Sequence, residues 1–183
     1  MYFPIFRGRQ FELLALRECV SRGILSNLII PIVEPVKVSS TYTKTVDSFI
    51  EANKAIAIIR NPQVGSWTKD LKKESNAKIR EQAIGQLKDV NVIPSFYVTP
   101  MLSACIKNAA QNGTDIESLL LLCNNPEYIG DYEEVIGDNT PLYNIIPDKG
   151  DFRRRIRLNR VMCEDHFPKQ TRNIDYLNIV YLV

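Results

Sequence analysis

The chain has 183 residues, of which 45% are hydrophobic and 24% are charged. Those values are typical of one globular domain with a sizeable core, and they exclude a disordered or fibrous protein. Its 23 basic and 21 acidic side chains leave a net charge of +2, which gives no general attraction to nucleic acid or to an anionic membrane.

The sequence lacks the common signatures of metal, cofactor and membrane binding. Its four cysteines lie far apart and form no Cys-x-x-Cys pair, so we expect neither a metal site nor a disulfide framework. It contains no glycine-rich phosphate loop, and no motif in it indicates which cofactor, if any, the protein binds. No apolar run approaches the roughly 20 residues that span a bilayer, and the first ten residues do not resemble a signal peptide. We therefore expect a cytoplasmic protein that contacts no membrane.

The first half of the chain predicts alternating helices and strands. Apolar spacing predicts a helix over 10–22, which Gly23 ends. The run 28–35 is apolar and rich in β-branched residues, and it closes on Glu34 and a proline, as buried parallel strands do. The same pattern then predicts a helix over 39–53, a strand over 54–62, a helix over 74–88 and a strand over 91–100.

The second half continues the alternation with shorter segments. A helix is predicted over 102–110, and 118–123 is the least secure strand, because a short apolar run is also compatible with buried helix. A weaker strand over 141–148, a helical turn over 151–156 and a short run over 159–165 follow. Before all of these, residues 2–6 form either an extended segment across one end of the sheet or an ordinary N-terminal strand.

This alternation predicts a parallel sheet with helices outside it. Six such units are too few for an eight-stranded barrel, which takes about 250 residues. An open doubly wound sheet fits the length, and a barrel-like sheet with its remaining strands missing is the alternative. We predict one α/β domain over 1–183 with a mostly parallel sheet, in barrel-like or partial (β/α) barrel order. Its two edge strands would expose unpaired backbone, which predicts a homodimer or aggregation.

Polar side chains follow the predicted strands, where parallel α/β proteins bind their ligands. Glu34 and Glu164 are the most specific candidate pair among them, and one of the two would act as a general base or metal ligand if their strands lie close together. The alternative is that a polar residue merely ends each strand. The catalytic candidates are Glu34, Lys37, Arg60, Glu164 and Asp165. The ligand-binding candidates are Arg7, Asn61, Arg172, Asn173 and Asp175.

Positive charge is concentrated near the C-terminal end of the sequence. Between Lys149 and Arg172 there are eight basic and three acidic residues. Such a segment predicts contact with an acidic partner or nucleic acid, and the alternative is a solvated helix whose arginines pair with carboxylates near Glu133. The residues that would carry the contact are Arg153, Arg154, Arg155 and Arg157.

Two blocks of sequence are more distinctive than this general pattern. The first is MYFPIFRGRQFELLALRE at 1–18, followed by IIPIVEPVK at 29–37, and the second is NRVMCEDHFPKQTRNIDY at 159–176. Together they resemble the phage beta protein family. The resemblance implies a protein of phages and bacterial genomes, here a C-terminally shortened member, and it transfers no catalytic residue to this chain.

These observations predict an α/β protein associated with phages or mobile elements that binds a small anionic ligand at its strand ends. The alternative is a non-catalytic protein that binds an acidic partner or nucleic acid through its arginine-rich segment. The position of the charged side chains distinguishes these two functions. Charged residues gathered in a cleft at the strand ends favour ligand binding, and arginines on an outward surface favour binding of a partner.

Overall fold

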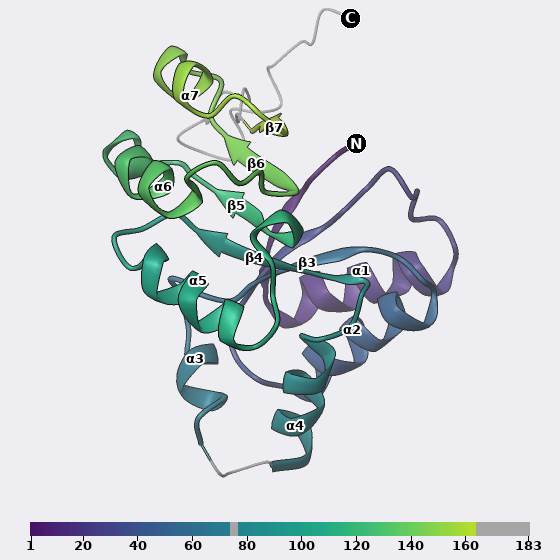
Figure 1. Cartoon of the computed structure of the whole chain (residues 1–183). Helices are drawn as coiled ribbons and strands as arrows, with labels where there is room; N and C mark the ends of the chain where they lie inside the picture. Colours follow the sequence, from purple (N-terminus) through teal and green to yellow (C-terminus); the bar gives the residue numbers. More distant parts are fainter. Residues whose placement is uncertain (74–76, 164–183) are drawn as a thin grey trace, which may run out of the picture.

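The computed structural model describes residues 1–73 and 77–163, which form a parallel sheet with helices on its outer side (Figure 1). Within these residues the sheet has seven strands, and each pairs in parallel with the next in chain order. The sheet curls into a half-barrel. The strands are β1 (Ile5–Gly8), β2 (Ile32–Pro35), β3 (Ile56–Ile59), β4 (Val92–Tyr97), β5 (Leu120–Leu122), β6 (Tyr143–Ile146) and β7 (Arg160–Met162).

Helical segments connect successive strands over the outer face of the sheet. The helices are α1 (Gln10–Ser21), α2 (Ser40–Glu51), α3 (Trp67–Asp70), α4 (Ala77–Gln86), α5 (Leu102–Gln111), α6 (Ile129–Ile136) and α7 (Gly150–Arg155), with 3₁₀ turns η1 (Ile116–Ser118) and η2 (Pro126–Tyr128). The α2 helix begins where the serine-rich sequence predicts a cap, because the Ser39 side chain accepts a hydrogen bond from the Tyr42 N–H.

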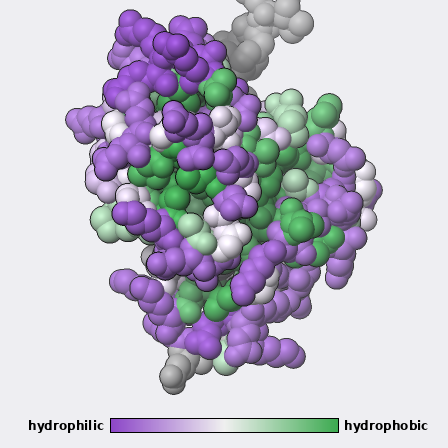
Figure 2. All heavy atoms as spheres, in the orientation of Figure 1, coloured by the Kyte–Doolittle hydropathy of each residue, from purple (hydrophilic) through white to green (hydrophobic). Residues whose placement is uncertain are grey.

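Two apolar clusters fill the space between the helices and the outer face of the sheet. One joins β2, β3 and β4 to α1, α2 and α4, with Val33, Phe49 and Ile58 among its buried members. The other joins β4, β5 and β6 to α5, α6 and α7, with Phe96 and Phe152 at its centre. Figure 2 shows that hydrophilic residues cover much of the surface, while hydrophobic residues reach it in hollows between them.

A third apolar cluster fills the concave inner face of the sheet. It contains Phe3, Ile30, Ile32, Ala57, Ile59, Leu120, Leu122 and Ile145. The Phe3 ring meets the Tyr143 ring edge-on, with centroids 4.7 Å apart. The segment before β1 therefore reaches β6 across the concave side, which is how the curled sheet buries its inner face.

The predicted parallel, barrel-like architecture is confirmed, including the strand within 118–123, which is β5. Residues 2–6 continue the sheet, since Tyr2 bridges Ile29 and β1, which begins at Ile5, pairs in parallel with β2, while Phe3 packs across the concave side against Tyr143. The sequence reasoning missed α3 and α6. Both are short: the buried Ile129, Tyr132 and Ile136 of α6 do have helical spacing, but over only eight residues.

None of the helices within the described ranges is both long enough and apolar enough to cross a membrane.

Candidate functional site

Polar side chains from four neighbouring strands meet at the carboxyl edge of the half-barrel. Arg7 lies one residue before the end of β1 and is in register with Glu34 of β2. Asn61 follows β3, and Tyr97 ends β4. We call these four residues the strand-end cluster. They lie together because parallel strands place their carboxyl ends at one edge of a sheet.

Glu34 is the most deeply buried member of the strand-end cluster. Its side chain is 5% exposed, although it carries a carboxylate. The Oε1 atom accepts a hydrogen bond from the Gln63 N–H at 2.8 Å, and Oε2 accepts one from the Tyr97 hydroxyl at 3.2 Å. Both donors are neutral, and no ion pair within 4.0 Å joins Glu34 to a cation of the described residues.

Asn61 fixes the position of Tyr97. Its Oδ1 accepts from the Tyr97 N–H at 2.8 Å, and its Nδ2 donates to the Tyr97 carbonyl at 2.9 Å. The amide side chain thus pairs with β4 as another strand residue would, and this holds the Tyr97 phenol against Glu34. The sequence placed Asn61 among the ligand-binding candidates, whereas the structure shows it bonded to Tyr97.

Tyr97 acts in this cluster as a hydrogen-bond donor. Burial and the adjacent Glu34 carboxylate raise the pKa of its phenol above the ordinary value, and the positive charge of Arg7 partly offsets this rise. The hydroxyl therefore stays protonated at neutral pH. A protonated phenol next to a carboxylate can orient a ligand or share a proton with it, and it cannot serve as a base.

Two exposed cations lie at this edge of the sheet, one within the strand-end cluster and one near it in the sequence. Arg7 of the cluster lies one residue before the end of β1, and its charge reaches the Tyr97 phenol. Lys37 lies in the loop that follows β2. Both side chains are therefore available to solvent at the edge that carries the buried Glu34.

Arg60 lies away from the strand-end cluster, so the expectation that it shares a cleft with Glu34 is wrong. Successive residues of a strand point to opposite faces, and Ile59 occupies the inner face. The Arg60 guanidinium therefore lies on the helix side, where it donates to the Leu87 carbonyl at 2.7 Å and to the Thr114 hydroxyl at 3.3 Å.

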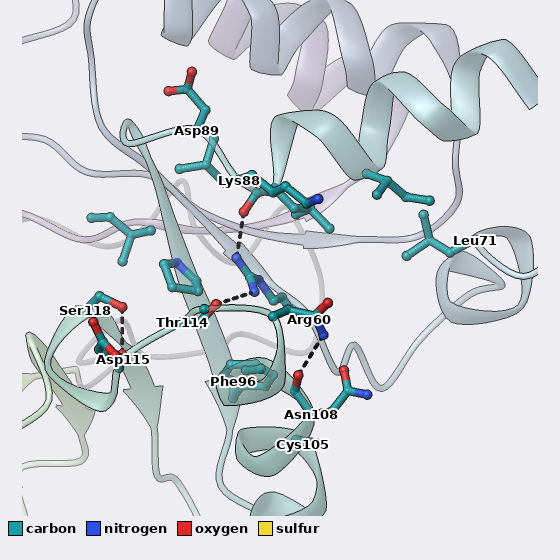
Figure 3. A pocket seen from close by; sticks show the side chains of 18 of the residues that line it. Arg60, Leu71, Lys88, Asp89, Phe96, Cys105, Asn108, Thr114, Asp115 and Ser118 are labelled. Atoms are coloured by element: carbon teal, nitrogen blue, oxygen red, sulfur yellow. Dashed lines mark hydrogen bonds between the residues drawn. The ribbon is translucent and has the colours of Figure 1, made fainter.

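Arg60 lines the larger of two cavities outside the sheet (Figure 3). This cavity, of about 920 Å³, lies over the outer face of β4 between α4 and α5, and we call it the α4–α5 cavity. The smaller one, of about 530 Å³, lies between α5 and α6. Trp67 also lines the α4–α5 cavity, and the sequence reasoning missed it, because a lone tryptophan after a loop is usually part of the core.

Three arginines of the basic segment form ion pairs with neighbouring carboxylates. Arg153 pairs with Asp148 at 3.3 Å, Arg154 pairs with Asp151, and Arg155 binds Glu133 through two nitrogens. The Arg157 Nε donates to the Arg154 carbonyl. These contacts match the alternative in which the arginines pair within the chain.

Several predicted residues lie outside the part of the chain that the structure describes. These are Glu164, Asp165, Arg172, Asn173 and Asp175. The proposed pairing of Glu34 with Glu164 therefore stays a prediction. In residues 1–73 and 77–163, no group of three or more His, Cys, Asp or Glu side chains could hold a metal ion.

Comparison with known proteins adds no relative to this description. No family model, no curated protein and no solved structure matches the chain.

Proposed function

We propose that the protein binds a small anionic ligand, which also carries a hydroxyl or amino group, at the strand-end cluster. The observation that supports this most is the Glu34 carboxylate, which is 5% exposed and bonded to neutral donors. A charge buried without a counter-ion costs free energy of folding, and such groups concentrate at functional sites.

The chemistry of the ligand follows from what Glu34 and its neighbours leave unused. Each carboxylate oxygen has two lone pairs, and each oxygen of Glu34 accepts one hydrogen bond from a described donor. A ligand hydroxyl or ammonium group can donate to the remaining lone pairs. Arg7 and Lys37 are exposed nearby and suit the anionic end of the same molecule, because guanidinium and ammonium groups bind carboxylate and phosphate.

Isothermal titration calorimetry with three related probes tests this proposal. Glycerol 3-phosphate carries both features, inorganic phosphate has the negative charge without the hydroxyl-bearing carbon chain, and glycerol has only the hydroxyl groups. We expect glycerol 3-phosphate to bind at least tenfold more tightly than either of the others. We also expect Arg7→Gln and Glu34→Gln each to weaken this binding about tenfold, since a hydrogen bond to a charged group contributes about 1.5–3 kcal/mol.

Arg22→Gln is the matched control, because it removes an exposed cation from the far end of α1. Its affinity for glycerol 3-phosphate should equal that of the wild type. Far-UV circular dichroism of Glu34→Gln separates lost binding from lost folding, and the exposed Arg7 provides a variant that does not disturb the core. Equal affinities for glycerol 3-phosphate and phosphate would contradict the proposal, as would equal effects of the Arg7 and Arg22 substitutions.

The alternative function, binding through the arginine-rich segment, has weaker support. Arg153, Arg154 and Arg155 are neutralised by carboxylates of the same chain. Replacing all three by alanine should therefore leave any binding of labelled single- or double-stranded DNA unchanged in fluorescence anisotropy. The association with phages and the resemblance to the phage beta protein family stay predictions.

A further inference from the structure

The α4–α5 cavity arises from an uneven layer of helices. The α4 helix leans toward α2, to which Gln86 and Gln82 bond through the Thr43 carbonyl and the Asp47 carboxylate. The α5 helix packs toward α6 instead. A cavity lies between them over the buried outer face of β4, and its volume of about 920 Å³ is in the range of small-molecule sites.

The floor and walls of this cavity are mainly apolar. Pro94 and Phe96 of β4 line it, together with Leu71 after α3 and Leu87 after α4. Ala109 contributes from α5. Pro94, Phe96 and Ala109 are already buried. A ligand that enters the cavity therefore removes from water mainly the apolar surface of Leu71, Leu87 and the exposed Ile84, which favours an apolar body.

Arg60 places a positive charge against this apolar lining. Its described partners, the Leu87 carbonyl and the Thr114 hydroxyl, are both neutral, and its buried Nε has no partner among the described residues. Burial lowers the pKa of Arg60, as expected for a cation that lacks a counter-ion. Asp89 also lines the cavity, but Figure 3 shows its carboxylate directed away from Arg60.

Trp67 supplies a second donor without an acceptor. The side chain is 1% exposed and lines the α4–α5 cavity, and its Nε1–H has no partner among the described residues. Buried donors are nearly always paired in native proteins. The buried Tyr42 hydroxyl, whose ring lies 4.6 Å from that of Trp67, also has no partner among the described residues, so three unpaired polar groups lie on this side of the sheet.

We propose that the α4–α5 cavity binds an apolar carboxylate, with its carboxylate at Arg60 and its apolar body against Pro94 and Phe96. The guanidinium suits a carboxylate because it can donate two parallel hydrogen bonds. Lys72 and Lys88 at the same cavity are matched by Asp89 and Asp115, so Arg60 is the one cation of the described lining left in excess. This site lies on the opposite side of the sheet from the strand-end cluster and does not depend on the function proposed there.

The protein carries its own reporter for this test, because Trp67 is the one tryptophan of the chain. Titration with decanoate, below the concentration at which it forms micelles, should change the tryptophan fluorescence and saturate. Decanol and acetate, which lack the charge and the apolar body respectively, should bind at least tenfold more weakly. Octanoate should bind roughly fifteenfold more weakly than decanoate if both additional methylenes are buried.

Variants then identify the site. Arg60→Gln should weaken decanoate binding at least tenfold, Arg60→Lys should restore part of it, and Lys69→Gln is the matched control outside the cavity. Ala104→Phe narrows the cavity from an exposed position of α5, so it tests the site without disturbing Arg60. The strand-end variant Arg7→Gln should leave decanoate binding unchanged.

Three results would overturn the proposal. One is equal binding of decanoate and decanol, which would mean that Arg60 recognises no charge. Another is unaltered decanoate binding in a folded Arg60→Gln or Ala104→Phe variant. The third is the absence of any binding by fluorescence and calorimetry, which would mean that the chain itself satisfies Arg60 and Trp67.

Discussion

The loop after β3 depends on a glycine that no other residue can replace without strain. Gly65 has φ +78°, and a Cβ at this position would stand 2.1 Å from the Val36 carbonyl oxygen. That oxygen accepts hydrogen bonds from the Ser66 N–H at 2.7 Å and the Trp67 N–H at 3.1 Å. Gly65→Ala should therefore push the loop away from Val36 and break both bonds.

The size of the effect can be worked from these contacts. The left-handed conformation costs a residue with a Cβ about 1–2 kcal/mol. Two lost backbone hydrogen bonds add about 1 kcal/mol each, so we expect Gly65→Ala to lower the free energy of unfolding by about 3–4 kcal/mol. Urea unfolding followed by circular dichroism measures this value, and the Trp67 fluorescence of the native variant should also change.

Gly85→Ala is the matched control for this substitution. Gly85 lies within α4, and a Cβ at this position would meet nothing within 4 Å. Alanine is favoured over glycine in a helix by about 0.8–1 kcal/mol, so this variant should be more stable than the wild type. A loss of less than about 1 kcal/mol in Gly65→Ala would refute the reasoning, because left-handed strain alone reaches that value.

Three further predictions concern the strand-end cluster, a buried phenol and the sheet edges. Tyr97→Phe should lower the free energy of unfolding by about 1–3 kcal/mol in urea, because Glu34 Oε2 loses its donor, and an unchanged free energy of unfolding would contradict this role of the hydroxyl. Burial raises the pKa of Tyr132 to about 12, so the stability that its neutral phenol confers is complete below pH 10 and is lost as pH rises toward 12. Tyr132→Phe should flatten the fall of stability over that pH window, and an unchanged slope would contradict the assignment. The edge strands also predict a homodimer. Sedimentation at tens of micromolar checks this prediction, and a clean monomer would count against it. Ile5 is 44% exposed on the edge strand β1, so Ile5→Lys is the variant that tests this edge as the contact.

The architecture was predictable because its signal is local. Most strands lie in short apolar runs followed by polar residues or proline, and the longer helices have an apolar period. The curl of the sheet was less accessible, since it depends on contacts such as Phe3 with Tyr143, far apart in the sequence. The short α6 helix was missed although Ile129, Tyr132 and Ile136 have helical spacing, because two turns are shorter than the window over which periodicity identifies a helix.

The candidate site was predictable only in part. Strand ends are local features, so Glu34 and Asn61 were found among the candidates. Which face a side chain takes is a property of the whole sheet, so the sequence did not reveal that Arg60 turns toward the helices. The roles of Tyr97 and Trp67 also depend on contacts between residues 30 or more positions apart, and a local sequence pattern does not predict such contacts.

The end of β3 serves both proposed sites because neighbouring residues face opposite sides of the sheet. Arg60 reaches outward to the α4–α5 cavity, while Asn61 bonds to the Tyr97 backbone and so holds the phenol at Glu34. The backbone between them is fixed by the ladder, since the Arg60 N–H donates to the Ser95 carbonyl at 2.8 Å. A side-chain substitution on one face therefore leaves the backbone of the other in place. The sheet keeps the buried Glu34 carboxylate and the Arg60 guanidinium apart, so neither serves as the counter-ion of the other.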